Sequence, residues 1–511
     1  MNALIVAPLL LPAIMAAASL LFMRRHRWVG AGISIIGVIG LTALALYLLV
    51  TASSGEISVY ALGNWTAPFG IVLVLDRLSA LMLLLTALLA LAVVCHAVLT
   101  GLDRKGWHFH PLFQFQLLGI NGAFLTGDLF NLFVFFEVLL IASYGLMLHG
   151  QGAERLKAGV QYVIVNLIGS TLFLFAVGIL YGITGTLNMA DMAARIPALP
   201  ASDQGLLRAG THLLIIVFAL KAALLPLQLW LPRTYAGTAP PVAALFAIMT
   251  KVGAYAIIRT VTLIFGENAG AASWAPEVWM MPAALGTMVI GFAGLLAART
   301  LRDLAAFGLL GSTATLLVAI AAFEPTALAA GLYYLLHTTL AAAMLFLVVD
   351  LIKRRRGRYG DTIAPSPRFA GIEALSLLYL LAAVAMAGLP PLSGFIGKLL
   401  ILQATMSHVW VAWIWAIILG TTLLGILGLA RAGSAIFWKS AAHPDNPVEG
   451  ARGTESDGQL TEALPAAGLL ALLAALTIWA GPVTHYTEAT TQQLFAPAGY
   501  IEAVLRPATG G

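Results

Sequence analysis

The chain consists of long apolar segments separated by short polar ones. A helix of ~20 apolar residues spans the ~30 Å hydrocarbon layer of a membrane, at ~1.5 Å per residue. We therefore predict an all-α polytopic membrane protein with about 14 transmembrane helices. Segment 371–407 exceeds one bilayer thickness, so we expect it to be tilted, broken or partly outside. In chain order the predicted helices are residues 3–23, 29–50, 72–100, 111–127, 129–149, 158–182, 207–232, 241–265, 277–298, 302–322, 326–352, 371–407, 409–437 and 463–481.

Four polar segments interrupt or follow these helices. Residues 51–71 read as an outside loop that could hold a short hairpin, and residues 184–206 as a second outside loop. Residues 441–462 are predicted to form a flexible inside loop, and residues 482–511 an outside tail. None of the four is large enough for a soluble catalytic domain.

The composition excludes a soluble protein. The 511 residues are 60% hydrophobic and 10% charged, whereas a soluble domain is about 25% charged. Basic residues follow the first apolar segment and no cleavage-site pattern stands out, so we interpret that segment as a retained helix and not as a signal peptide. The single Cys95 excludes a disulfide framework. The net charge of +5 does not indicate nucleic-acid binding, because it reflects basic residues gathered on one side of the membrane.

The distribution of basic residues predicts the orientation. Most of the 27 lysines and arginines fall in the segments that follow odd-numbered helices, with a dense run at 353–358. Cytoplasmic loops carry such an excess, so these segments are predicted to lie inside and both termini outside. A miscounted helix would scramble the asymmetry, which therefore also supports the helix count.

Two of the predicted helices are interrupted next to a lysine. Pro226 follows Lys221 in helix 7, and Pro390 and Pro391 precede Lys398 in helix 12. Proline lacks an N–H and frees a backbone carbonyl, which is tolerated at membrane depth where the break lines a cavity or is covered by protein. The alternative is that these are coincidental kinks.

The two interrupted helices are five helices apart and therefore cross the membrane in opposite directions. That offset predicts two inverted five-helix repeats, helices 4–8 and helices 9–13, and matching broken helices point to a transport site. The predicted units are residues 1–110, 111–265 and 277–438, followed by 463–511 with helix 14 and the tail.

Several ionisable residues lie deep inside predicted helices. Glu137 is near the middle of helix 5, Lys251 is ten residues into helix 8, and His337 is in the middle of helix 11. Each charged group at such a depth costs roughly 2.5–3.5 kcal/mol on insertion scales, so it marks an ion or proton pathway by default. Pairing Glu137 with Lys221 would offset part of that cost, and a row that continues to Lys398 could pass protons without a cofactor. Alternatively, Glu137 is kept protonated or serves only to hold two helices together, and His337 is only a packing residue.

No cofactor or metal site is predicted. The chain has no phosphate-binding GxGxxG or Walker loop, no CxxC and no HExxH. His108 and His110 lie in an inside loop, and we see no acidic neighbours that would complete a metal site with them. Asp76 and Asp128 lie near the edges of predicted helices and could serve a cation path, although a capping or interfacial role is the simpler expectation.

Four motifs together resemble a known family. Residues 119–144, 221–232, 239–245 and 388–395 resemble the antiporter-like subunits shared by respiratory complex I and the Mrp cation/proton antiporters. The sequence of residues 121–137 is similar to that of the D-type subunit of the Mrp Na⁺/H⁺ antiporters in particular. This resemblance covers essentially the whole chain.

The resemblance implies a fourteen-helix fold with two inverted repeats and a proton path along the membrane centre. It implies that Glu137 is the helix-5 glutamate, Lys221 the lysine that pairs with it, Lys251 the relay lysine of helix 8, His337 the helix-11 histidine and Lys398 the lysine on the exit side. Some complex I members carry glutamate at that last position, whereas lysine fits the D-type pattern. The absence of a lateral helix after helix 14 argues against the long complex I subunit.

We derive three hypotheses for the function. The first is a subunit of a multisubunit Na⁺/H⁺ antiporter, with K⁺ as the other possible cation, which works with other Mrp-type subunits in a bacterial inner membrane. The second is a proton-translocating subunit of a redox-driven complex I or membrane-bound hydrogenase relative, which would need electron-carrying partners. The third is a membrane scaffold that transports nothing, which the buried charges disfavour.

Overall fold

The structure, a computed structural model, describes residues 2–22, 27–441 and 461–506. The first half contains α1 (Ala7–Phe22), α2 (Arg27–Ala52), β1 (Ser58–Ala61), β2 (Val72–Leu75), α3 (Arg77–Leu99), α4 (Phe109–Leu125), α5 (Leu129–Leu148), α6 (Ala153–Thr184), α7 (Met189–Arg195), α8 (Gln204–Lys221), α9 (Trp230–Gly237), α10 (Pro240–Phe246) and α11 (Met249–Leu263). The second half contains α12 (Glu277–Ala297), α13 (Leu301–Ala321), α14 (Pro325–Arg355), α15 (Ile372–Ala387), α16 (Ser393–Ala404), α17 (Val411–Gly433), α18 (Lys439–Ala441), α19 (Leu464–Ile478), α20 (Ala480–Phe495) and α21 (Ala498–Leu505). The predicted all-α class is confirmed.

Twelve helical segments of the described chain are long and apolar enough to cross a membrane. Two of the fourteen predicted helices are not among these twelve. One is α4, which has 17 residues, and the other is segment 371–407, which forms the two shorter apolar helices α15 and α16. The expectation that this long segment could be broken is therefore confirmed. The chain is a multi-pass membrane protein.

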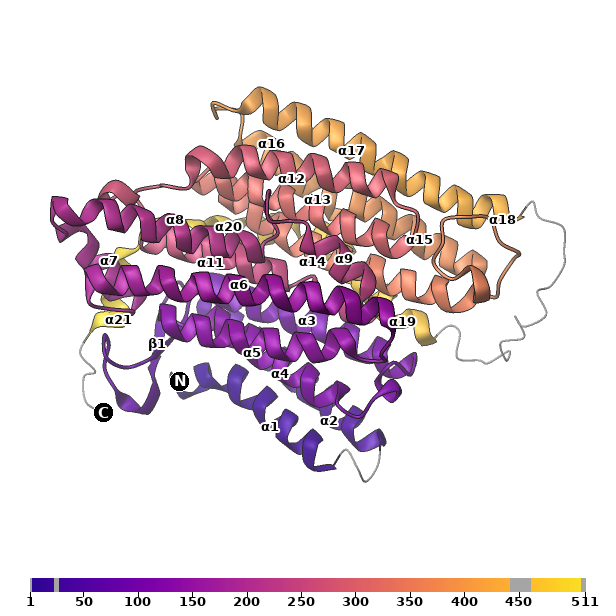
Figure 1. Cartoon of the computed structure of the whole chain (residues 1–511), viewed down its shortest axis with the longest axis horizontal. Helices are drawn as coiled ribbons and strands as arrows, with labels where there is room; N and C mark the ends of the chain where they lie inside the picture. The colour runs from indigo at the N-terminus through magenta and orange to yellow at the C-terminus, as the bar shows by residue number, and fades with distance from the viewer. Residues whose placement is uncertain (1, 23–26, 442–460, 507–511) are drawn as a thin grey trace.

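The most buried helices lie in the middle of the bundle. The segments Pro240–Leu263, Leu301–Ala321 and Pro325–Arg355 are almost entirely enclosed by the rest of the chain. By contrast, α2 and α17 expose large apolar side chains such as Ile36 and Leu419, as expected of helices that face lipid or neighbouring subunits. In Figure 1 the helices run roughly parallel, with α1 and α2 at one edge of the bundle and α17 at the other.

The two ends of the bundle are built differently. β1, α7 and α21 lie at one end and α18 at the opposite end (Figure 1). At the first end, β1 pairs with β2 in an antiparallel hairpin, with Ser58 opposite Leu75 and Ala61 opposite Val72. This confirms the hairpin, although its second strand takes the residues where helix 3 was predicted to begin.

Other polar segments also differ from prediction. The loop expected at 184–206 contains α7, and the expected tail contains α20 and α21 up to Leu505. Hydropathy missed α20 because it is rich in threonine. The hydroxyls of Thr484 and Thr490 each bond the carbonyl four residues earlier, so the helix itself satisfies them. Most of the loop expected at 441–462 lies outside the described residues.

Helix breaks occur beside the two lysines of the interrupted helices. α8 ends at Lys221 and α9 begins at Trp230, so the segment with Pro226 separates them. α15 ends at Ala387 and α16 begins at Ser393, on either side of Pro390 and Pro391. A third interruption, between α10 and α11, was not predicted. There, residues 247 and 248 donate to carbonyls three residues earlier, so the helix tightens without a proline.

A buried ion pair anchors the hairpin end of the bundle. Arg259 of α11 donates to both carboxylate oxygens of Asp76, at 2.6 and 2.9 Å. Asp76 also caps α3 by accepting from the N–H of Ser79 at 2.8 Å, so its capping role is observed. Burial alone would raise the pKa of the Asp76 carboxyl, but Arg259 outweighs burial and lowers it. Tyr500 of α21 lies 5.3 Å from the guanidinium, so the contact ties α3, α11 and α21 together.

We expect Asp76→Asn to destabilise the protein by about 3–5 kcal/mol, because it leaves Arg259 buried without its counter-charge. Thermal unfolding of the purified protein in mild detergent measures this. Glu502→Gln is the matched control, because it removes the exposed Glu502–Arg506 pair and should cost under about 1 kcal/mol. Equal unfolding temperatures for the two variants would contradict the anchoring role.

Candidate functional site

The five sequence-predicted residues lie on helices that contact one another in series. Glu137 is on α5, Lys221 on α8, Lys251 on α11, His337 on α14 and Lys398 on α16. α6 packs between α5 and α8, α13 between α11 and α14, and α17 against α16. In Figure 1, α5 and α6 lie toward one side of the bundle, α8, α11 and α14 in its middle, and α16 and α17 toward the other side. The five residues thus lie on helices linked by a continuous series of contacts, and we refer to these residues together as the row.

The first part of the row is centred on α6. The hydroxyl of Ser170 donates to Glu137 Oε1, and Lys221 Nζ donates to Asn166 Oδ1 at 2.9 Å. Among the described residues, no hydrogen bond or ion pair joins Glu137 directly to Lys221. The two residues are therefore not in direct contact, but the Glu137 charge still acts on Lys221 through space, so their pairing stays a prediction.

Lys251 is the most deeply buried member of the row. Its side chain has no exposed surface, and its Nζ lies 3.1 Å from Thr313 Oγ1 and 3.3 Å from Thr250 Oγ1. Two residues further along α11, Gly253 fits against the end of α8. A Cβ at Gly253 would lie 2.7 Å from the backbone N of Ala222, so only glycine allows this close approach.

The next part of the row joins α13, α14 and α16 through hydroxyl groups. Thr338, beside His337, donates to Ser312 Oγ at 2.7 Å, and Ser312 is the chain neighbour of the threonine that contacts Lys251. His337 Nδ1 lies 2.9 Å from Ser393 Oγ, and its Nε2 lies 3.1 Å from the carbonyl oxygen of Ala385. Both ring nitrogens therefore have partners, and one of them is in the first turn of α16.

Lys398 is held by the second helix break. Its Nζ donates to the carbonyl of Ala387 and to Thr422 Oγ1, both at 2.8 Å, and lies 5.5 Å from the ring centre of Phe292. The last carbonyls of a helix lack an intrahelical partner, so the end of α15 supplies acceptors to both His337 and Lys398. In the first break, Trp230 Nε1 likewise donates to the carbonyl of Leu220 at 3.0 Å.

The sequence pattern missed most of the side chains that hold the row together. They are uncharged, and hydropathy does not distinguish a single hydroxyl or amide in an apolar helix from its neighbours. The signal that could have found them is a buried polar residue one helical turn from another, as for Asn166 and Ser170. These missed residues are Asn166, Ser170, Ser312, Thr313, Thr338, Ser393 and Thr422.

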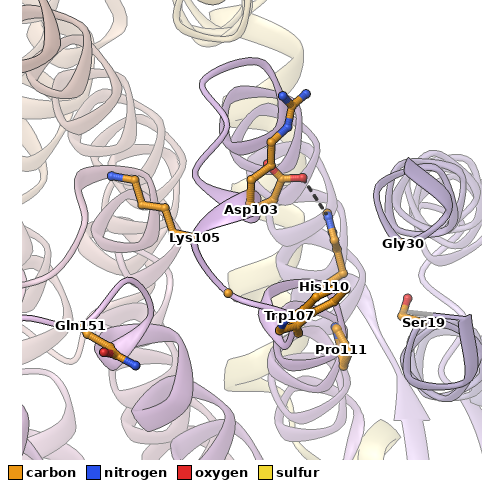
Figure 2. Close-up of a pocket in the computed structure, with 10 residues that line it drawn as sticks. Ser19, Gly30, Asp103, Lys105, Trp107, His110, Pro111 and Gln151 are labelled. Atoms are coloured by element: carbon orange, nitrogen blue, oxygen red, sulfur yellow. Dashed lines mark hydrogen bonds and ion pairs between the residues drawn. The ribbon is translucent and has the colours of Figure 1, made fainter. Parts of the chain in front are cut away.

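A separate polar cavity of about 340 Å³ lies at the start of α4. His110 Nε2 lies 3.4 Å from Asp103 Oδ2, and Figure 2 shows this contact with Lys105 and Gln151 to one side. The expectation that the histidines of this loop have no acidic neighbour is therefore wrong for His110, because the turn at Asp103 folds back on α4. Within the described ranges, no group of three histidine, cysteine or acidic residues could hold a metal ion.

Known proteins resemble the chain over its whole length. Residues 126–425 match the family model described as "NADH:quinone oxidoreductase/Mrp antiporter, TM". The chain is 40% identical to a probable K⁺/H⁺ antiporter subunit, of the D type, from Rhizobium meliloti, covering 99% of this chain and 98% of that protein. It is 35% identical to the D-type Na⁺/H⁺ antiporter subunit from Alkalihalophilus pseudofirmus, covering 99% and 100%. The chain belongs to this family.

Solved structures share the fold of this chain. A chain in the structure of the Mrp complex from Dietzia sp. superposes with a TM-score of 0.85 at 28% identity, covering 99% of this chain and 100% of that one. A chain of the archaeal membrane-bound sulfane sulfur reductase has a TM-score of 0.86, with the same coverage, at 23% identity. That likeness shows the shared fold alone. The family resemblance stated from the sequence motifs is confirmed.

The C-terminal end of α5 in this family member contains a histidine whose charge should affect stability. His149 Nε2 lies 2.9 Å from the carbonyl oxygen of Leu102. Burial lowers the pKa of His149, the bond to Leu102 opposes this, and the charge of Arg155 lowers it further. The folded protein therefore binds a proton at His149 more weakly than the unfolded chain does.

We expect the stability that His149 contributes to decline as the pH falls below the unfolded value of ~6.5, until the lowered folded pKa is reached. His149→Gln should flatten the pH dependence of thermal unfolding between about pH 5 and 7. His108→Gln, which changes an exposed histidine of the preceding loop, serves as the control. An unchanged slope in His149→Gln would contradict this expectation.

Proposed function

We propose that this chain is a membrane subunit of a multisubunit monovalent cation/proton antiporter and that protons cross it along the row from Glu137 to Lys398. The observation that carries the proposal is the burial of Lys221, Lys251 and Lys398, which contact only neutral acceptors among the described residues. An uncompensated ammonium at membrane depth is costly and marks a path along which charge moves. A scaffold would have no need for three of them.

The cation and the partners are inferred from the relatives. The two most informative relatives bear the names of K⁺/H⁺ and Na⁺/H⁺ antiporter subunits, so we assign Na⁺ or K⁺ as the exchanged cation. The partners are other Mrp-type subunits, in a bacterial inner membrane. The basic segments face the cytoplasm and both termini face outward.

The proposed units support transport rather than enzymatic catalysis. We assign residues 111–265 and 277–438 as two inverted repeats, flanked by residues 1–110 and 463–511. The supporting observation is that each repeat contains a proline-containing helix break beside a buried lysine, α8–α9 in the first and α15–α16 in the second. Paired broken helices of this kind form the ion sites of many transporters.

The alternative, a subunit of a redox-driven proton pump, makes a different prediction about partners. The structural likeness to the sulfane sulfur reductase chain is at 23% identity and supports the shared fold only. Affinity purification of the tagged chain in mild detergent, with mass spectrometry of what co-purifies, decides between the two. Small hydrophobic membrane subunits with a larger antiporter-like subunit support the antiporter, whereas flavin or iron–sulfur proteins would overturn it.

We expect Glu137→Ala, Lys221→Ala and Lys251→Ala each to reduce cation-dependent proton exchange by roughly 10² or more, because each removes a group that must accept and release the proton. Exchange is measured in everted membrane vesicles by a pH-sensitive dye after addition of NaCl or KCl. Glu277→Ala and Lys157→Ala, at exposed positions, are the matched controls and should keep wild-type rates.

The same vesicles must show that the complex is assembled. Co-purification of the partner subunits with each variant provides this control. If the variants lose exchange together with assembly, the residues are structural. Wild-type exchange in all three assembled variants would show that the chain acts as a scaffold.

A further inference from the structure

Two side chains of α6 form separate hydrogen bonds with Glu137 and Lys221. Asn166 and Ser170 are four residues apart and therefore lie on one face of α6, about 6 Å along the helix. Lys221 Nζ donates to Asn166 Oδ1 at 2.9 Å, and Ser170 donates to Glu137 Oε1. Both α6 residues are buried, with 2% and 8% of their surfaces exposed.

The amide of Asn166 is oriented by a second hydrogen bond. Its Nδ2 donates to the carbonyl of Tyr162 at 2.8 Å, so Oδ1 is the atom that faces the lysine. Gly169 lies between the two polar residues. A Cβ there would lie 2.6 Å from Leu220 Cδ2 and 3.8 Å from Lys221 Nζ, so glycine makes room for the Leu220 side chain next to the lysine.

We propose that Asn166 is a positioning residue that holds Lys221 Nζ away from Glu137, and that Ser170 holds the carboxylate in the complementary position. Lys221 then has two alternative acceptors, a neutral amide and a carboxylate. Beside a carboxylate an ammonium keeps its proton, and on a neutral amide it gives the proton up more readily. The α6 face therefore sets how easily a proton leaves the first lysine. This inference concerns the regulation of the proton site described above and rests on the proposed function.

The second repeat contains a similar arrangement. Asn166 follows Tyr162 by four residues on α6, and His337 follows Tyr333 by four residues on α14. Both helices pack against a broken helix, α8–α9 and α15–α16 respectively. Asn166 thus occupies in the first half the kind of place that the histidine occupies in the second, which supports a role in the row and not only in packing.

The test is the pH profile of exchange by the intact complex in vesicles. Asn166→Leu keeps the size of the side chain and removes the acceptor, so Lys221 should turn to Glu137 and release its proton less readily. The pH of half-maximal exchange should then rise by about one unit or more. Asn166→Gln keeps an amide and should restore most of the wild-type profile. Thr171→Val, an exposed neighbour bonded to Leu167, should leave the profile unchanged.

Ser170→Ala tests the other half of the arrangement and does not depend on how well Asn166→Leu folds. It should shift the profile in the same direction, because the carboxylate is released toward the lysine. An unchanged pH midpoint in both assembled variants, or an equal loss of exchange at every pH, would overturn the inference. The proposed function would survive that result as long as Glu137→Ala and Lys221→Ala abolish exchange. Wild-type exchange in those two variants would instead remove the proposed function itself.

Discussion

The structure depends on one constraint, which is that an ammonium placed in a hydrocarbon layer must find acceptors within the protein. The three buried lysines solve this in three ways. Lys221 uses an amide oxygen, Lys251 uses threonine hydroxyls, and Lys398 uses a hydroxyl and a carbonyl released by a helix break. None of these acceptors carries a full charge. Each lysine can therefore hold a proton and still release it. A carboxylate beside each lysine would instead hold the proton in place.

The helix breaks are part of the same solution. A continuous helix uses its carbonyls internally, whereas the last turn of α15 offers two of them to side chains of the row. The breaks also need support, because freed backbone groups in an apolar layer are costly. That support comes from α6 and α14, which pack against α8–α9 and α15–α16.

Hydropathy predicted the long helices, because this signal sums over many residues. Charge identified the ionisable residues, because a single charged residue stands out in an apolar segment. They failed where a local interaction decided the structure. The hydroxyls of the threonine-rich α20 are bonded within the helix, and β2 occupies the start of a predicted helix. The tightened turn between α10 and α11 contains no proline that would have predicted it. The hydrogen bonds of Glu137 to Ser170 and of Lys221 to Asn166 were also missed, because a scale that scores charge does not detect these neutral side chains.

The glycine of α11 has a consequence for motion. At Gly253 the backbone of α11 touches the backbone at the end of α8, with no side chain between them to absorb a shift. The helices that contain the first and second lysines, α8 and α11, therefore contact each other directly through their backbones. At the other end of α11, Arg259 is clamped to the cap of α3. We therefore expect a shift of α8 at the first break to displace α11, which contains the second lysine and is fixed to α3 through Arg259.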